Sequence, residues 1–170
     1  MMEPTDEARW EAAQEGAELT AEGELSAAVS ELKRVLTDDP QNHYGYFFLG
    51  AALYSQGELL PALKSYLRCV ELSPEYTGAL LHLGRTLHAL GRYEEALRVG
   101  RQVLLKDKHD PDALHLMGTC HFARGEGAAA ELYLKHFLET RPEIEVALEV
   151  EGMLQVLRGD VAAQDTESED

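Results

Sequence analysis

The sequence predicts an all-α solenoid made of helical hairpins, and three observations lead to that fold class. Glycine returns every 34 residues along the chain. Each 34-residue period holds two segments whose apolar residues are spaced as on one face of a helix. No insertion shifts the register. A period of this length is the mark of stacked helical repeats, in which each unit needs its neighbours to bury an apolar face.

Two glycine positions define the period. Ten of the fourteen glycines belong to one of two series that run seven residues apart. These series are Gly16, Gly50, Gly84, Gly118 and Gly152, and Gly23, Gly57, Gly91, Gly125 and Gly159. Alanine repeats in the same register at Ala28, Ala62, Ala96 and Ala130. Because small residues let two helices approach closely, we expect the first glycine series to face the alanines within each hairpin.

The second period shows its two helices most clearly. A first helix is expected over about residues 43–56, where apolar residues fall at i, i+3, i+4 and i+7. A second helix is expected over about residues 59–72, after Gly57. Glycine caps a helix well in that place, because it adopts positive φ without steric cost. Pro61 falls in the first turn of the second helix, where its missing N–H costs little.

The period divides the chain into four hairpins with flanking segments. The expected parts are an acidic lead-in at 1–8, hairpins at 9–42, 43–76, 77–110 and 111–144, a capping helix at 145–159 and a disordered acidic tail at 160–170. The capping helix repeats the first helix of a hairpin without its partner. Its Glu151 and Gln155 stand where inner hairpins carry leucine, which suits a helix whose outer side meets water.

The charge of the chain excludes two classes of partner. Asp and Glu number 31 against 15 Lys and Arg, for a net charge of −16, and the acids concentrate at both ends. Such a charge repels phosphates, so we expect no nucleic acid partner. The longest apolar run, residues 44–54, is far short of the roughly 20 residues that span a bilayer, so we expect no membrane insertion.

Cysteine use and the first residues favour the cytoplasm. Cys69 and Cys120 form no CxxC motif and no framework of disulfides. Residues 1–10 are acidic and polar, without the apolar core of a secretory signal. We therefore expect a soluble cytoplasmic protein.

The sequence lacks the motifs of catalysis and of metal or phosphate binding. HExxH, GxSxG and GxxxxGK[ST] are absent. Four histidines fall on expected first helices, but no pair has i, i+4 spacing with a carboxylate partner: His82, His88, His115 and His121. We therefore predict no enzyme activity, no cofactor and no metal.

The repeats resemble the tetratricopeptide repeat, a 34-residue helical hairpin with glycine, alanine, proline and large residues at set positions. The resemblance is best in the second hairpin, at Tyr46, Leu49, Gly50, Leu53, Gly57, Ala62, Tyr66, Cys69 and Pro74. It covers residues 9 to about 159. Some positions depart from the pattern: Ala12 and Glu15 stand where bulky residues are usual. Gly100 replaces an aromatic residue, which leaves room for a neighbouring side chain or a bend.

This resemblance implies a right-handed superhelix whose first helices line a concave groove, where members of the family generally bind other proteins. An apolar patch on such a surface marks a partner site. Arg85, His88 and His115 add a small basic focus to a strongly acidic chain. The candidate groove residues are Tyr44, Phe47, Ala51, Tyr54, Leu81, Arg85, His88, His115, Thr119 and Phe122.

The expected function is that of a non-catalytic adaptor or scaffold. Its groove would bind a segment of a partner protein through apolar anchors, with an acidic group near Arg85. The carboxylate clamp of a well-known subfamily is absent, because Ala13, Ala17 and Phe48 stand where its Lys and Asn would be.

Three alternatives stay open for the groove and for the chain. The groove aromatics could pack between repeats and meet no ligand. The chain could be a small acidic cytoplasmic chaperone for a secreted client, similar to the tetratricopeptide repeat chaperones of type III secretion. It could also associate with itself through its end repeats.

Overall fold

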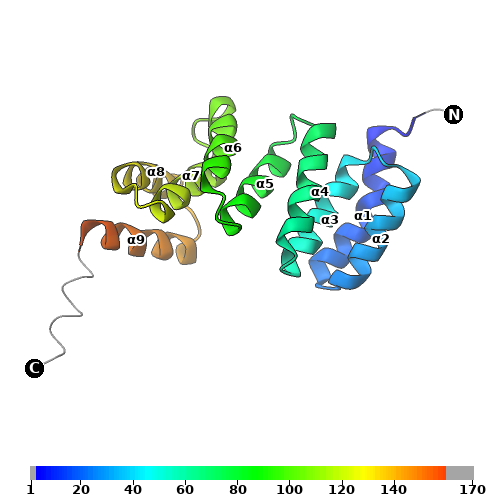
Figure 1. Cartoon of the computed structure of the whole chain (residues 1–170), viewed down its shortest axis with the longest axis horizontal. Helices are drawn as coiled ribbons and strands as arrows, with labels where there is room; N and C mark the ends of the chain where they lie inside the picture. The colour runs from blue at the N-terminus through cyan, green and yellow to red at the C-terminus, as the bar shows by residue number, and fades with distance from the viewer. Residues whose placement is uncertain (1–2, 160–170) are drawn as a thin grey trace, which may run out of the picture. The chain divides into compact units, whose positions relative to one another are not determined.

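The computed structural model describes residues 3–159, and these residues form helices and no strand. The helices are α1 (Asp6–Glu22), α2 (Leu25–Asp38), α3 (His43–Ser55), α4 (Leu59–Leu72), α5 (Thr77–Ala89), α6 (Tyr93–Lys106), α7 (Pro111–Ala123), α8 (Gly127–Glu139) and α9 (Ile144–Arg158) (Figure 1). The predicted acidic tail at 160–170 lies outside the described residues.

Polar side chains set where some of the first helices begin. Thr5 caps α1 by accepting a hydrogen bond from the backbone N–H of Ala8 (3.2 Å). Because of this cap, α1 begins three residues before the first hairpin was expected to start. Asp110 caps α7 by accepting from the N–H of Ala113 (2.8 Å), and Pro111 occupies the first turn.

Glycine ends or follows every first helix, as the repeat register predicts. The glycines of the second series have φ between +73° and +83°: Gly23, Gly57, Gly91, Gly125 and Gly159. Backbone in this left-handed region strains any residue with a Cβ, so glycine fits these turns. Each of the first four turns leads directly into the second helix of a hairpin.

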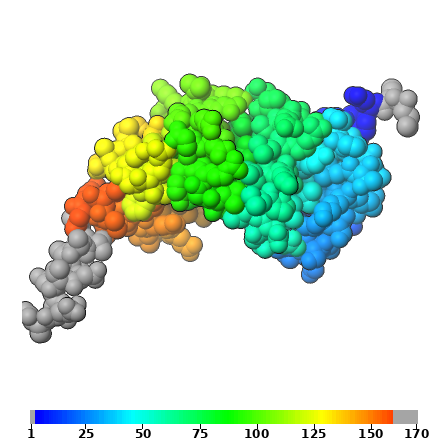
Figure 2. Space-filling view, in the orientation of Figure 1, coloured from blue at the N-terminus to red at the C-terminus, as the bar shows by residue number. Residues whose placement is uncertain are grey.

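The chain forms two compact units, residues 1–91 and 92–170, and the boundary falls between α5 and α6. In the first unit, α1 packs on α2, α2 on α3, α3 on α4 and α4 on α5. The first helices also pack on one another, α1 on α3 and α3 on α5. Figure 2 shows part of the surface of α2 in blue and of α4 in teal.

Within the first unit, glycine and alanine let paired helices approach closely. The ring of Tyr66 is fully buried, and a Cβ added to Gly50 would lie 2.8 Å from its Cε1 atom. Ala62 is also fully buried. The ring thus fills the space that the glycine leaves, and Tyr66 rather than the predicted Ala62 supplies the atoms nearest to an added Cβ.

The second unit is built by α6 to α9, each packed on the next. Its core gathers side chains from α7, α8 and α9: Leu114, Leu134, Phe137, Val150 and Leu154. At Gly100, a Cβ would lie 2.7 Å from Sδ of Met117, so the missing aromatic side chain is replaced by a neighbouring methionine.

The architecture is an all-α helical repeat solenoid, as the sequence predicts. Among residues 3–159, every helix is too short or too polar to cross a membrane.

Candidate functional site

The candidate site of the first unit lies where the two first helices α3 and α5 pack together beside α4. These helices carry seven of the ten predicted groove residues. A cleft of about 220 Å³ opens between them. Its lining residues are Ala51, Tyr54, Ser55, Tyr66, His82 and Arg85.

The cleft brings together three predicted groove residues and three others. Ala51, Tyr54 and Arg85 were expected at the groove, and Tyr54 keeps 39% of its surface exposed. Ser55, Tyr66 and His82 were missed. Tyr66 belongs to a second helix, and its register position predicts internal packing, so no sequence signal pointed to its contact with the cleft.

Tyr66 and His82 form the polar floor of the cleft. The Oη atom of Tyr66 lies 3.3 Å from Nδ1 of His82. Burial raises the pKa of Tyr66, and the nearby charge of Arg85 offsets only part of this effect. The phenol therefore stays protonated near neutral pH and is able to donate its proton to the imidazole.

Two of the predicted groove aromatics are largely occupied by internal packing. The half-buried ring of Phe47 lies 5.0 Å from that of Tyr76 and 5.2 Å from that of His82, between centroids. The Tyr44 ring lies 5.2 Å from that of Trp10. For these two residues the structure favours the alternative that they pack between helices.

The remaining predicted positions of α5 differ in exposure. Leu81 has only 8% of its surface exposed, so it packs inside the unit and offers little contact to a partner. His88 is half-buried in the last turn of α5, and Arg85 is exposed. Arg85 is therefore the main contact that α5 offers at this surface.

The second unit holds the other three predicted groove residues on α7. The His115 ring lies 4.8 Å from the Phe137 ring. Thr119 donates its hydroxyl proton back to its own helix, at the carbonyls of His115 (2.9 Å) and Leu116 (3.1 Å). Phe122 is half-buried. Packing and internal hydrogen bonds thus take up much of this surface.

Metal ligands and reactive thiols are not gathered at either surface. No group of three or more His, Cys, Asp or Glu side chains within residues 3–159 is placed to hold a metal ion. Cys69 and Cys120 are fully buried, and burial raises the pKa of each thiol to about 12. Thiols in this state are poor nucleophiles.

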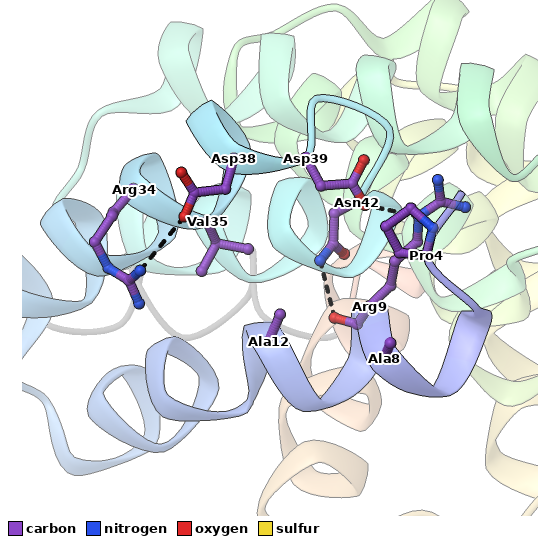
Figure 3. A pocket seen from close by; sticks show the side chains of 9 residues that line it. All are labelled: Pro4, Ala8, Arg9, Ala12, Arg34, Val35, Asp38, Asp39 and Asn42. Atoms are coloured by element: carbon purple, nitrogen blue, oxygen red, sulfur yellow. Dashed lines mark hydrogen bonds and ion pairs between the residues drawn. The ribbon is translucent and has the colours of Figure 1, made fainter. Parts of the chain in front are cut away.

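A second cavity, of about 230 Å³, lies between α1 and α2 (Figure 3). Its lining residues are Pro4, Ala8, Arg9, Ala12, Arg34, Val35, Asp38, Asp39 and Asn42. Nε of Arg9 donates to Oδ2 of Asp39 at 2.8 Å, and the buried Asn42 donates to the Arg9 carbonyl at 2.9 Å. In Figure 3, Ala8 and Ala12 follow α1, and Arg34 lies across from them on α2.

Comparison with known families gives two matches. Residues 22–103 match the family described as Anaphase-promoting complex, cyclosome, subunit 3. Residues 87–148 match the family described as Tetratricopeptide repeat. No curated protein is a significant match to the sequence.

Solved structures with similar folds are repeat proteins from bacteria and MamA proteins. A tetratricopeptide repeat protein from Parabacteroides merdae has a TM-score of 0.74 at 22% identity, over 89% of this chain and 60% of that one. MamA protein has a TM-score of 0.75 at 20% identity, over 94% and 86%. A thermophilic TPR protein in Thermus thermophilus has a TM-score of 0.70 at 24% identity, over 93% and 85%.

These identities establish a shared fold and nothing finer. The chain spans 60% of the length of the Parabacteroides merdae protein. One family match and two of these solved structures are described as tetratricopeptide repeat proteins.

Proposed function

We propose that the chain, whose residues 87–148 match the tetratricopeptide repeat family and whose fold is shared with a solved tetratricopeptide repeat protein, acts as a non-catalytic adaptor or scaffold that holds a segment of a partner protein. The fold supports protein–protein interaction in general, and self-association as well. The observation that carries the finer proposal is the open cleft between α3, α4 and α5, with Tyr54 and Arg85 at its edge.

The chemistry of the cleft fits a short side chain that ends in an anionic group. The small side chain of Ala51 leaves room in the cleft for a ligand group, and the Tyr54 ring offers an exposed apolar face. The guanidinium of Arg85 provides charged donors, which prefer carboxylate oxygens. A partner segment with an apolar anchor and an acidic residue would therefore match this surface.

We place the protein in the cytoplasm and expect no nucleic acid partner. Two free, buried cysteines are typical of a reducing compartment. The net charge of −16 opposes binding to phosphate backbones.

A test of the cleft uses peptides selected from a random phage-displayed library on the full chain. Selected peptides should bind the wild-type protein with a Kd on the order of 1 μM. The double variant Tyr54→Ala, Arg85→Gln should lose about tenfold or more in affinity, because it removes the exposed ring and the charge. Isothermal titration calorimetry measures both.

The matched control removes an exposed arginine and an exposed apolar residue elsewhere. Arg101→Gln with Leu105→Ala changes such residues on α6, and affinity should stay within about twofold of wild type. Circular dichroism should show the same helix content in all three proteins. If the peptides bind the cleft variant as tightly as wild type, the cleft is not the binding site.

The second candidate function is a chaperone for a secreted client, and the acidic charge of the chain favours it. A chaperone would raise the soluble yield of a co-expressed apolar client, whereas an adaptor would leave the yield unchanged. Self-association is separate from both, and light scattering over a range of protein concentrations tests it.

A further inference from the structure

The cavity between α1 and α2 lies where α1 lacks a side chain that the other first helices have. Ala12 is 34 residues before Tyr46, and the same register then holds Leu80 and Leu114. Ala12 lines the cavity, together with Val35 of α2. The void is therefore the space that a large side chain at this register would occupy.

The second hairpin shows what fills the equivalent space when it is occupied. Tyr46 stands at the register of Ala12, and Arg68 stands at the register of Arg34. Arg68 donates a hydrogen bond to Glu71 at 3.1 Å, and this contact and the phenol of Tyr46 both raise the pKa of its guanidinium. A phenol ring with an arginine beside its hydroxyl group is thus the arrangement that this repeat uses.

The lining of the cavity suits a neutral ring with one polar end. Pro4, Ala8, Ala12 and Val35 supply an apolar wall (Figure 3). Each arginine of the lining is paired with acids, Arg9 with Asp39, and Arg34 with Glu31 and with Asp38 (3.5 Å). The lining itself holds two arginines and two aspartates, so its charges balance and an ionic ligand would gain little from them.

The size of the cavity also suits a six-membered ring. An apolar cavity of about 150 Å³ is large enough to bind benzene. The space between α1 and α2 measures about 230 Å³, which leaves room for a hydroxyl group. Arg34 has five N–H donors, so its acid partners do not use up its capacity to donate.

We propose that this cavity is a binding site for a phenol ring, supplied by a tyrosine side chain of a partner protein. The ring packs against Ala8, Ala12 and Val35, and its hydroxyl oxygen accepts a hydrogen bond from Arg34. The partner thus provides from outside the side chain that Tyr46 provides within the second hairpin.

The test titrates p-cresol, the side chain of tyrosine, into the isotope-labelled full chain and follows amide signals by NMR. Saturable shifts are expected at Ala8, Ala12 and Val35, with a Kd on the order of 1 mM. Toluene, which lacks the hydroxyl group, should bind about fivefold more weakly. Absence of saturable shifts at these residues would overturn the proposal.

Variants connect the binding to the cavity. Ala12→Tyr and Ala12→Leu fill the space from within, and each should abolish p-cresol binding. The leucine variant serves if the tyrosine variant folds poorly, because leucine stands at this register in α5 and α7. Arg34→Gln should reduce p-cresol affinity to that of toluene, whereas Arg98→Gln on α6 should not change it. Unchanged binding in the Ala12 variants would show that the ring binds elsewhere.

Two further experiments test whether a tyrosine can supply the ring and whether the cleft takes part in binding it. N-acetyl-tyrosinamide carries the same ring on a peptide backbone and should bind at Ala12 with similar affinity. If only free p-cresol binds, a partner's tyrosine is the wrong source. The double variant Tyr54→Ala, Arg85→Gln should bind p-cresol as wild type does, so failure of the cleft as a peptide site would leave this result intact.

Discussion

At the scale of single residues, the same repeated glycine has different surroundings in different helices. A Cβ at Gly50 would press on the buried ring of Tyr66. Apart from its chain neighbours and the backbone of its own helix, a Cβ at Gly152 of α9 would meet no atom of the described chain within 4 Å. Packing therefore requires glycine at position 50. At position 152 glycine follows the repeat register, but packing does not require it.

This difference predicts opposite effects of one substitution. Gly50→Ala should lower the free energy of unfolding by about 1–3 kcal/mol, because the added Cβ would force the buried Tyr66 ring out of its packed position. Urea denaturation followed by circular dichroism measures the change.

Gly152→Ala is the matched control for the Gly50 variant. It should raise the free energy of unfolding by up to about 1 kcal/mol, because alanine is the better helix former and the site is open. Equal effects of the two substitutions would contradict the assigned packing.

At the scale of helices, α1 is tied to the end of α2 by the ion pair of Arg9 with Asp39. Each side chain keeps 19% of its surface exposed. Burial acts to raise the pKa of Asp39, but hydrogen bonds from Arg9 and from the backbone N–H of Gln41 outweigh it and lower the pKa. The carboxylate is thus favoured in the folded state.

The lowered pKa sets the direction of the pH dependence. A carboxyl group with a lower pKa in the folded state adds stability that is complete above its ordinary value of 3.8, and that is lost as the pH falls through the folded value. Wild type should therefore exceed Asp39→Asn by about 1 kcal/mol from pH 5 to 8, and the excess should shrink below about pH 4. Urea denaturation of both proteins across this range provides the comparison. A constant difference down to pH 2 would mean that the ion pair does not hold α1.

The helices were predictable from the sequence because the repeat register marks their ends. The second helix of the second hairpin was expected over 59–72, and α4 has those bounds. α1 begins at Asp6, three residues before the first repeat period at residue 9, because Thr5 caps the helix outside the repeat frame. Local capping by Thr5 therefore sets the start of α1 independently of the period.

The candidate site was predictable only in part. Sequence register identified Tyr54 and Arg85, because first-helix positions follow the period. It did not identify the phenol of Tyr66 or the ring of His82 as cleft residues, since cleft shape depends on how far each side chain reaches. The small size of Ala12 was visible in the sequence, but the volume that it opens was not.

At the scale of the whole molecule, stability in a repeat array is close to a sum of local terms. The described chain has no long-range strand pairing that would join distant parts, and each unit has its own packed helices. A destabilising substitution in one unit should therefore lower the stability mainly of the helices in that unit.

Hydrogen exchange measured by mass spectrometry tests this locality. Gly50→Ala should reduce amide protection in α3, α4 and α5 by about tenfold, in keeping with a loss of roughly 1.4 kcal/mol, and should change α7 and α8 far less. An equal loss of protection in all these helices would show that the molecule unfolds as one cooperative body.

The C-terminal cap of α9 also has a use in protein design. Gly159 turns the backbone as the other capping glycines do, so a grafted copy of the α4 sequence after it would begin in the orientation of a second helix. Glu151 and Gln155 are then the first residues to exchange for leucine. The array could then be lengthened by one helix, half a repeat, at a time, with the bounds of its existing helices unchanged.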